Sequence, residues 1–385
     1  MQVAHPGGID ALIYESGRLS SLRWAMVTND AALTCTGSPS RLALLKAGFR
    51  IARIFSPEHG ISATGNDGER QPDGHDPLTG LPVVSLYGNG YAPTSSLLDD
   101  IDAVLFDIPD VGCRFYTYLW TMTYVLEACA KEGKLLLVAD RRNPIGTDLS
   151  KAEGPWLDEE ACASFLGRWN MPLKHACTLG ELALFFAATR VPNAEVEVVR
   201  IPSYGRGHAR LDDPFSPTSP AMHNLQSALV YPGLCLLEGV NVNEGRGTDL
   251  PFARFGAPWL DAERLMQSID RVACEGIRIH REDFQANSEP YQGLLCKGIR
   301  LEVRDPSLFL GVRFGISLLQ AMHGAHGELL RERPYPTHAN PTGLSHLDRL
   351  IGVRQAFERI VSDSIPETDL SSRWLSMMEP HLLYR

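Results

Sequence analysis

A glutamate and a histidine stand together in the segment Ser56-Pro57-Glu58-His59-Gly60, directly after a short apolar run. Cleavage of a glycosidic bond usually requires a carboxylic acid, held in place, to protonate the leaving oxygen. Glu58 is therefore predicted to be that acid, with His59 tuning it or binding substrate. The structural alternative is that Glu58 caps the next segment or pairs with an arginine, while His59 satisfies a loop carbonyl.

A second group of polar residues lies at the end of the apolar run at residues 103–108. Asp107 and Asp110 flank a proline, and Arg114 lies on the same connection. These side chains are predicted to contact a ligand. An Asp107–Arg114 ion pair that holds the loop is the alternative.

Aromatic and basic residues extend this group. Tyr116 and Tyr118 offer a ring for stacking on a sugar and a phenol for hydrogen bonding, or they belong to the core. Arg141 and Asn143 follow the apolar run at residues 135–139 and are predicted to bind substrate.

The segment 238–248 in the second half combines hydrogen-bonding side chains with glycines. Glycine lets the backbone approach a ligand closely, and Glu, Asn and Arg bind sugar hydroxyls and carboxylates. Glu238, Asn241, Glu244 and Arg246 are predicted to contact substrate. A rigid loop held by its own side chains is the alternative.

Parallel strands would bring the residues of the first half together. Continuous apolar runs separated by helical patterns indicate a parallel sheet covered on both faces, and ligands gather at the carboxyl ends of such strands. The predicted strands are residues 23–28, 51–55, 81–86, 103–108 and 135–139. The predicted helices are residues 39–47, with Ser38 as a cap, and residues 94–99 and 117–132.

A Gly/Pro-rich stretch at residues 202–220 predicts a domain boundary near residue 205. The fold class is therefore α/β, with a Rossmann-like domain at residues 1–205 and a smaller α+β domain at residues 206–385. The long loop at residues 60–80 is predicted to be functional or mobile, and a lid is one role open to it. Further expected elements are a helix at 178–188 opened by a Thr178–Glu181 capping box, a helix at 261–274, strands at 277–280 and 298–303, and a helix at 311–323.

Composition narrows the range of partners. The formal charge of −10 and the pI near 5.7 argue against nucleic acid or an anionic membrane as a partner. No apolar run is long enough for a membrane span, and the first residues do not have the pattern of a secretory signal, so we expect a cytoplasmic protein. No GxGxxG follows the first strand, which argues against a dinucleotide. The eight cysteines are predicted to be buried thiols, neither disulfides nor a zinc site.

Beyond these features, the chain resembles a known family over nearly its whole length. The motifs that carry the resemblance occur in order and are FSPEHGI, TGLPVVSLYG, VLFDIPDVGCRFYTYLWTM, DRRNPIG, EGP, TLGELA, LVYPGLCLLEG, NEGRGTDLPFARFGAPW and CKGIRLEV. Together they are similar to the exo-β-N-acetylmuramidases of NamZ type, glycoside hydrolase family 171, long catalogued as a domain of unknown function.

The resemblance implies an active site in the cleft between the two domains and release of N-acetylmuramic acid from non-reducing ends of peptidoglycan fragments. It implies no metal, nucleotide or other cofactor, and a small sugar substrate as the partner. The family's glutamate maps to Glu58, its Arg-Phe-Tyr-Thr-Tyr motif to Arg114, Tyr116 and Tyr118, and its Glu-Gly-Arg-Gly motif to residues 244–247.

The predicted site residues form two sets, one catalytic and one substrate-binding. The catalytic residues are Glu58, His59, Tyr116 and Glu244. The substrate-binding residues are Asp107, Asp110, Arg114, Tyr118, Arg141, Asn143, Glu238, Asn241 and Arg246. The lactyl carboxylate of muramic acid calls for a guanidinium, which Arg114, Arg141 or Arg246 would supply. The second carboxylate is assigned to Glu238 or Glu244, unless the substrate's own acetamido group takes that part.

The sequence also departs from the family pattern and leaves two other functions open. The departures are at Arg142, where a proline is usual, and at Ala221 and His223, which replace an asparagine and a proline. Two other classes remain, a non-catalytic binding module for muropeptides and a metal-dependent hydrolase. The metal ligands would be His59, Asp107, Asp110 and Asp140.

Overall fold

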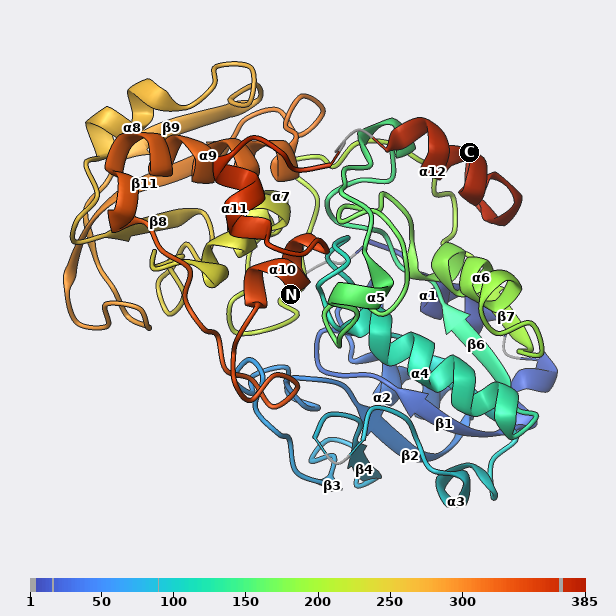
Figure 1. The fold of residues 1–385 in the computed structure, drawn as a ribbon. Helices are drawn as coiled ribbons and strands as arrows, with labels where there is room; N and C mark the ends of the chain where they lie inside the picture. Colours follow the sequence, from blue (N-terminus) through green and yellow to red (C-terminus); the bar gives the residue numbers. More distant parts are fainter. Residues whose placement is uncertain (1–4, 16, 89, 367–369) are drawn as a thin grey trace.

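Seven strands form the sheet of the first half (Figure 1). The computed structural model describes residues 5–15, 17–88, 90–366 and 370–385, so residues 1–4 of the N-terminal stretch lie outside the described residues. The strand order is β3-β4-β2-β1-β5-β6-β7, and every neighbouring pair is parallel except β3 with β4. The strands are β1 (Arg23–Val27), β2 (Arg50–Ser56), β3 (Gly74–His75), β4 (Pro82–Ser85), β5 (Ala103–Phe106), β6 (Leu135–Ala139) and β7 (Val196–Val199).

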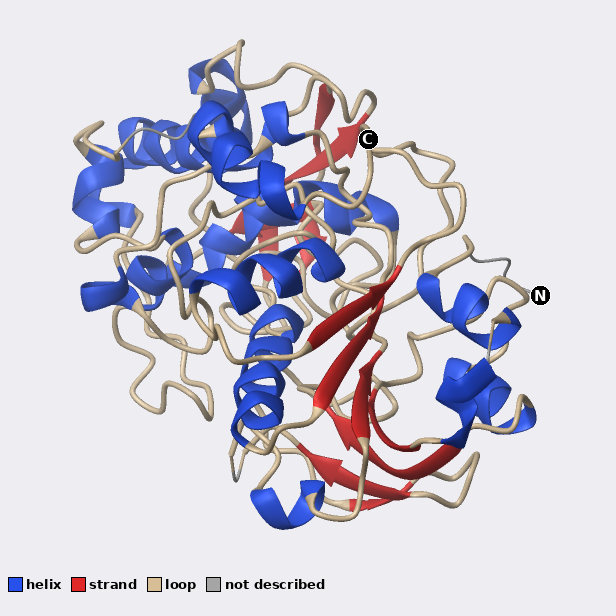
Figure 2. Ribbon diagram, turned by 90° about the vertical axis from the view of Figure 1, so that its right-hand side faces the viewer, coloured by secondary structure: helices blue, strands red, loops and turns tan. Residues whose placement is uncertain are grey.

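Helices cover both faces of this sheet, as Figure 2 shows. Alternate residues of β1 point to opposite faces, so Trp24 and Met26 pack against α1 and α2, whereas Ala25 and Val27 share the larger core with α4 and α6. The predicted parallel sheet with two covered faces is therefore confirmed. The helical elements of this half are α1 (Gly8–Tyr14), η1 (Gly17–Ser21), α2 (Ser40–Lys46), α3 (Ser95–Leu98), α4 (Tyr118–Lys131), η2 (Leu149–Lys151), α5 (Glu159–Cys162) and α6 (Leu179–Thr189).

The second half has a separate antiparallel sheet in which β11 pairs with β8, β9 and β10. Helices α7 and α9 pack closely beside this sheet. A Cβ at Gly315 would lie 2.4 Å from the Gly233 carbonyl oxygen, so this close approach requires glycine at position 315. This α+β arrangement agrees with the expected fold class. The elements are α7 (Leu225–Leu234), η3 (Cys235–Gly239), β8 (Arg254–Ala257), α8 (Ala262–Ser268), β9 (Ile277–Arg281), β10 (Phe284–Gln285), β11 (Leu295–Val303), α9 (Gly311–His326), η4 (Gly327–Leu329), α10 (His346–Ile351) and α11 (Ala356–Val361).

A last segment returns to the first half. Helix α12 (Ser371–Met378) and η5 (Glu379–His381) pack near η2 and α6, and the indole of Trp374 donates to the carbonyl oxygen of His175. The Tyr384 hydroxyl donates to Asp140 at 2.7 Å. The first half of the fold is therefore completed by residues far along the chain. Where the two domains divide stays a prediction; the structure has neither helix nor strand between β7 and α7, the segment that contains residue 205.

Several local predictions can be compared with the structure. The capping box of α6 is confirmed, since Thr178 accepts from the Glu181 amide while the Glu181 carboxylate accepts from the Thr178 amide. The prediction that Ser38 caps a helix was wrong: Pro39 is the N-cap, and Ser38 instead forms a turn with Thr34.

Three elements differ in extent or were missed. The helix expected at 261–274 ends at Ser268, because Ile269 adopts an extended backbone. Strands β3 and β7 were not predicted, since β3 has only two residues and β7 lies half-exposed at the sheet edge.

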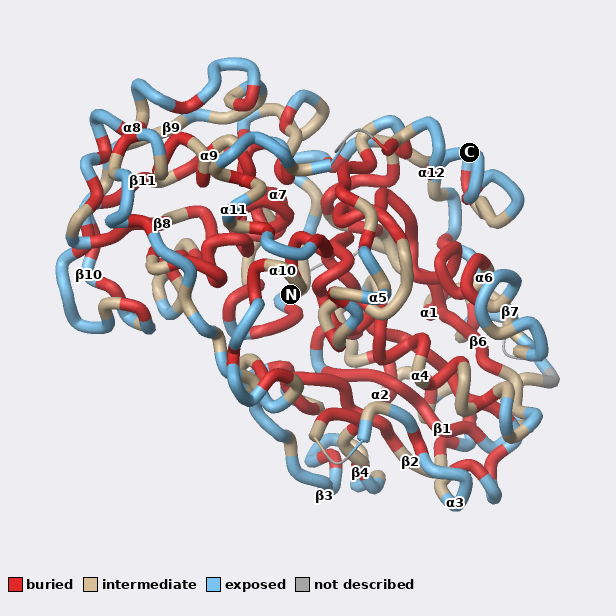
Figure 3. The backbone as a smooth tube through the Cα atoms, viewed as in Figure 1, coloured by how far each residue is buried: buried red, intermediate tan, exposed pale blue. Residues whose placement is uncertain are grey.

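Burial follows the layers of the fold. Figure 3 shows buried backbone along the central strands and exposed backbone around β3 and β10. Six of the eight cysteines are buried, and Cys35 and Cys274 are partly exposed. Among the described residues, no helix is long and apolar enough to cross a membrane.

Candidate active site

Glu58 lies just beyond the carboxyl end of β2. The strand order changes direction at β1, which has β2 on one side and β5 on the other, and ligands bind at such switch points. The carboxylate of Glu58 accepts from the Gly68 amide at 2.8 Å and from the Thr117 hydroxyl at 2.6 Å, and the residue is 7% exposed. Two donors from different connections therefore fix the orientation of this carboxyl group.

His59 has a strained backbone, with a φ of +69° in the left-handed region. Such a conformation is uncommon for a residue with a Cβ, costs roughly 1–3 kcal/mol and is concentrated at functional sites. The Nδ1 atom lies 2.8 Å from the Gly65 carbonyl oxygen, which can only accept, so Nδ1 carries the proton. Nε2 then faces Asp67, 3.8 Å away.

Five of the predicted residues line one cavity, which we call the inner cavity. It holds about 60 Å³ and is lined by residues that include Glu58, His59, Tyr116, Glu238 and Arg246. Residues from both halves of the chain therefore meet at this cavity.

A larger outer pocket of about 470 Å³ adjoins the inner cavity. Asp67, Ala221, Arg246 and Tyr335 belong to both linings. The Ala221 departure from the family pattern thus lies on the cleft. The inner cavity is far smaller than the several hundred Å³ of a typical ligand pocket, so a sugar ring enters only when its lining moves.

Three carboxylates surround the guanidinium of Arg246. Asp67 and Glu238 form ion pairs with its terminal nitrogens, and Glu244 Oε1 lies 3.2 Å from its Nε. Asp67 belongs to the glycine-rich loop of the first half, so its pair with Arg246 closes across the cleft. The next residue of this loop, Gly68, also contacts the second half, because its carbonyl oxygen accepts a hydrogen bond from the amide of residue 338.

The two glutamates beside Arg246 have opposite pKa shifts. Burial alone would raise the pKa of Glu238, but Arg246 and a hydrogen bond from His346 outweigh it and lower the pKa to about 2. Burial raises the pKa of Glu244 to about 7, because Arg246 compensates only in part and neither carboxylate oxygen has a hydrogen-bond partner. Glu238 is therefore ionised at neutral pH, whereas Glu244 is partly protonated and fully buried beneath the cavity.

The tyrosines of the second motif form the wall of the cavity. Tyr116 lines it and donates to the Thr218 hydroxyl at 2.6 Å. Tyr118 is buried behind Tyr116, with ring centres 4.9 Å apart, and donates to the Thr218 carbonyl oxygen. Burial raises the pKa of both phenols, so each is a neutral hydrogen-bond donor.

Arg114 lies away from the cavity and is 0% exposed. Its guanidinium donates to four carbonyl oxygens, two of which end helix α10, and burial lowers its pKa to about 9. The alternative of an Asp107–Arg114 pair was wrong, because Asp107 instead accepts from Arg141 Nε at 2.6 Å.

The remaining predicted residues lie elsewhere. Asp110, Arg141 and Asn143 line a separate pocket behind the Tyr116 wall. Asn241 hydrogen-bonds the backbone at Leu329 and Arg331.

The residues proposed for a metal site are also separated. Asp140 is buried with Thr178, Gly180 and Tyr384 as hydrogen-bond donors. Within the described ranges, no three His, Cys, Asp or Glu side chains are grouped so that they could hold a metal ion, and this includes the set of four considered above.

Sequence reasoning missed four residues of the site. Asp67, Thr117, Tyr335 and His346 line the inner cavity. Thr117 lies inside the Arg-Phe-Tyr-Thr-Tyr motif and Asp67 in the long loop predicted to be functional or mobile, so both had a signal. His346, whose ring stacks on Tyr335 at 4.6 Å, lies in no recognised motif and reaches Glu238 only through the tertiary fold.

The fold and the site together define a class of protein. A two-lobed α/β protein whose cleft presents a fixed carboxyl, an ionised second carboxylate and a guanidinium has the groups that glycoside hydrolases use. Family models agree: the N-terminal model of the exo-β-N-acetylmuramidase NamZ matches residues 24–226, and the C-terminal model matches residues 229–381. The chain belongs to the NamZ exo-β-N-acetylmuramidase family, as the motifs predicted.

Individual relatives support this membership. The peptidoglycan β-N-acetylmuramidase NamZ of Bacillus subtilis (strain 168) is 36% identical over 327 residues, which cover 83% of this chain and 78% of the relative. A DUF1343 family protein from Bacteroides fragilis NCTC 9343 superposes over the full length of both chains with a TM-score of 0.85 and 24% identity. A second DUF1343 protein from the same organism superposes over 99% of both chains with a TM-score of 0.76 and 26% identity.

Proposed function

We propose that this protein is an exo-β-N-acetylmuramidase that releases N-acetylmuramic acid from the non-reducing ends of peptidoglycan fragments. The observation that carries the proposal is the Glu58 carboxyl, fixed by two donors in the cavity between the lobes. The relative in Bacillus subtilis, named for the same activity, supports it.

Glu58 is the general acid of the proposed reaction. Its contact with Thr117 suits both protonation states, because the hydroxyl donates to a carboxylate and can rotate to accept from a carboxylic acid. Burial of a sugar in the cavity would exclude water from this carboxyl. Glu58 therefore protonates the leaving oxygen as the glycosidic bond breaks.

Glu238 is the second carboxylate in this proposal. It lines the cavity, whereas Glu244 does not, and its pKa of about 2 keeps it ionised throughout the neutral range. A fixed negative charge stabilises the positive charge that develops on the sugar ring in the transition state.

Arg246 is the candidate partner for the lactyl carboxylate. Of the three arginines considered from the sequence, Arg114 is wholly buried and Arg141 lines the other pocket, so Arg246 alone reaches the cavity. Asp67 pairs with Arg246 where the substrate carboxylate would bind, and its side chain is 28% exposed. Entry of the substrate would therefore exchange one carboxylate for another and widen the cavity.

The test is release of the chromophore from a chromogenic β-N-acetylmuraminide. Glu58→Gln is expected to reduce turnover about a thousandfold, because an amide cannot deliver the proton. Glu69→Gln, an exposed change in the same loop, is the matched control and is expected to retain full activity. A chelator is expected to leave turnover unchanged.

The outcomes separate the rival functions. Absence of turnover in the unmodified protein, together with binding of the disaccharide, would favour the binding module. Loss of turnover on chelation would favour the metal-dependent hydrolase. The cytoplasmic location stays a prediction from the sequence, and fractionation of the source cells tests it.

A further inference from the structure

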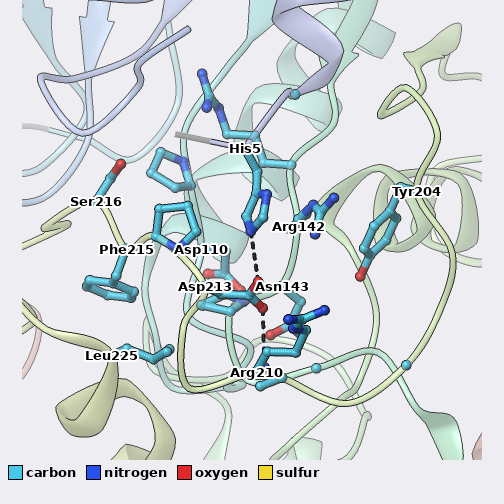
Figure 4. Close-up of a pocket in the computed structure, with 18 of the residues that line it drawn as sticks. His5, Asp110, Arg142, Asn143, Tyr204, Arg210, Asp213, Phe215, Ser216 and Leu225 are labelled. Atoms are coloured by element: carbon cyan, nitrogen blue, oxygen red, sulfur yellow. Dashed lines mark hydrogen bonds and ion pairs between the residues drawn. The ribbon is translucent and has the colours of Figure 1, made fainter. Parts of the chain in front are cut away.

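A second pocket lies behind the Tyr116 wall and has no part in the proposed reaction. It holds about 280 Å³ at the carboxyl ends of β5 and β6 (Figure 4). Thr218 lines it and accepts hydrogen bonds from Tyr116 and Tyr118. Neither Glu58 nor Glu238 belongs to its lining. We call it the arginine pocket.

Arginines outnumber acidic residues in the lining of the arginine pocket. Its lining has four arginines, at positions 141, 142, 206 and 210, against the two aspartates Asp110 and Asp213. Both aspartates have partners: Asp213 accepts from His5 at 2.8 Å and from the Arg210 amide, and Asp110 Oδ2 accepts from the Gly112 amide and lies 3.5 Å from His175. Asp110 Oδ1 is buried without a hydrogen-bond partner.

Three of the four arginines are also engaged. Arg141 pairs with Asp107, Arg206 with Glu181, and Arg210 with Asp212.

Arg142 is the exception within the described part of the chain. It forms no ion pair there, and its Nε is buried without a hydrogen-bond partner. The guanidinium carbon lies 5.0 Å from the centre of the Tyr204 ring, which orients it without neutralising it. Figure 4 shows Arg142 and Tyr204 side by side at the pocket. A guanidinium fixed in this way is prepared to form a forked contact with a carboxylate.

The rest of the lining combines apolar groups with the polar side chains of His5, Asn143, Tyr204, His208, Ser216 and Thr218. The rings of Pro109, Pro144 and Phe215 and the side chain of Leu225 face the space. Apolar walls with a few placed polar groups are typical of small-molecule sites, and the volume suits a molecule of about the size of one sugar or a dipeptide.

We propose that the arginine pocket is a second ligand site, which binds a small organic carboxylate through Arg142. Two sources supply this chemistry: a sugar acid, such as the product of the proposed reaction, and the carboxyl end of a short peptide. The site itself does not depend on the proposed function; only the identification of the sugar acid as a reaction product does.

Calorimetric titration of the intact protein tests the proposal with four probes. The carboxylates are N-acetylmuramic acid and N-acetyl-dialanine, and their neutral counterparts are N-acetylglucosamine and N-acetyl-dialanine amide. We expect at least one carboxylate to bind with higher affinity than its neutral counterpart. The carboxylate that binds better identifies the source.

Variants then locate the binding. Arg142→Met is expected to weaken carboxylate binding about tenfold or more, while Arg142→Lys retains part of the affinity. Arg200→Met removes an exposed charge outside the pocket and is expected to bind as the unmodified protein does. Arg246→Met separates binding of the sugar acid in the cleft from binding in the arginine pocket. Thermal unfolding confirms that each variant is folded.

Two results would overturn the proposal. One is that neither carboxylate binds better than its neutral counterpart, and the other is that Arg142→Met binds both as tightly as the unmodified protein. Turnover is measured separately, so an inactive protein that still binds a carboxylate through Arg142 would count against the proposed function alone.

Discussion

The two lobes meet at two junctions that use the same kinds of side chain in different ways. At the back junction, Arg114 donates to the last carbonyl oxygens of α10, and Glu153 accepts from two amides at the start of α9, at 2.9 and 3.0 Å. At the cleft junction, Arg246 meets Asp67, Glu238 and Glu244.

The difference lies in the partners of the charged groups. At the back junction each charge lies at a helix end of the complementary sign, where the backbone offers fixed partners, although Arg114 Nε is buried without one. At the cleft junction the partners of Arg246 are side-chain carboxylates, and that of Asp67 is partly exposed. Backbone partners hold the lobes together, whereas the exposed Asp67 carboxylate can be replaced by a ligand.

The largest expected effect is on the back junction. Arg114→Met leaves four buried carbonyl oxygens without a donor, and we expect the free energy of unfolding to fall by about 3–5 kcal/mol. Urea unfolding measures it, with the exposed Arg354→Met as the control. A loss below about 1 kcal/mol would show that the two junctions do not differ as described.

The cleft junction should make stability depend on pH. The pKa of Glu244 is about 7 in the folded protein against 4.5 for an ordinary glutamate, so the folded state binds more protons between these values. Stability therefore falls as pH rises from 4.5 to 7, by up to about 3 kcal/mol from this group.

The difference in stability between the unmodified protein and Glu244→Gln isolates the contribution of this carboxyl group. Glu244→Gln is expected to remove it, so that the variant gains stability relative to the unmodified protein between pH 5 and pH 8, as measured by urea unfolding. Glu238 acts only below this window, because its pKa is lowered to about 2. Parallel pH curves for the two proteins would contradict the prediction.

Arg246→Met is expected to lower activity, and also stability, because it leaves the buried carboxylates of Glu238 and Glu244 without their cation. We predict a fall of about a hundredfold in kcat/KM for the muraminide, because the contact to the lactyl carboxylate is lost. The loss should be smaller for the matching N-acetylglucosaminide, which has no lactyl group. Arg246→Lys keeps the positive charge but cannot form the two-pronged contact, so its kcat/KM for the muraminide should lie between those of the unmodified protein and Arg246→Met. Equal losses on both substrates would remove Arg246 from carboxylate recognition.

The smallest expected effect has the opposite sign. Asp67→Asn removes the carboxylate that competes for Arg246, so KM for the muraminide should fall about two- to fivefold with kcat little changed. Steady-state kinetics on both substrates measures it, and KM for the N-acetylglucosaminide should not change. A rise in KM would mean that Asp67 orients Arg246 and does not compete with substrate.

Patterns local in sequence allowed much of the fold to be predicted. The central strands and α4 are continuous apolar or amphipathic runs, so their periodicity indicated them directly. The capping box of α6 is contained within four residues. Strand β7 and the C-terminal end of α8 depend on tertiary packing, which no local pattern records.

The site was predictable residue by residue but not as a geometry. Glu58, His59 and Arg246 lie in motifs, and they line one cavity. The sequence could not separate Arg114 from Arg246, because the difference between carbonyl and carboxylate partners comes from segments more than a hundred residues away. His346 had no signal at all for the same reason.

The hydrogen bond from Tyr384 to Asp140 has a consequence for synthesis of the protein. Asp140 directly follows β6, the neighbour of the edge strand β7, and burial raises its pKa to about 6 even with Tyr384 in place. A nascent chain that has emerged only as far as β7 holds this carboxyl without its last donor. The first lobe therefore acquires this hydrogen bond only after the residues of the second lobe have been synthesised.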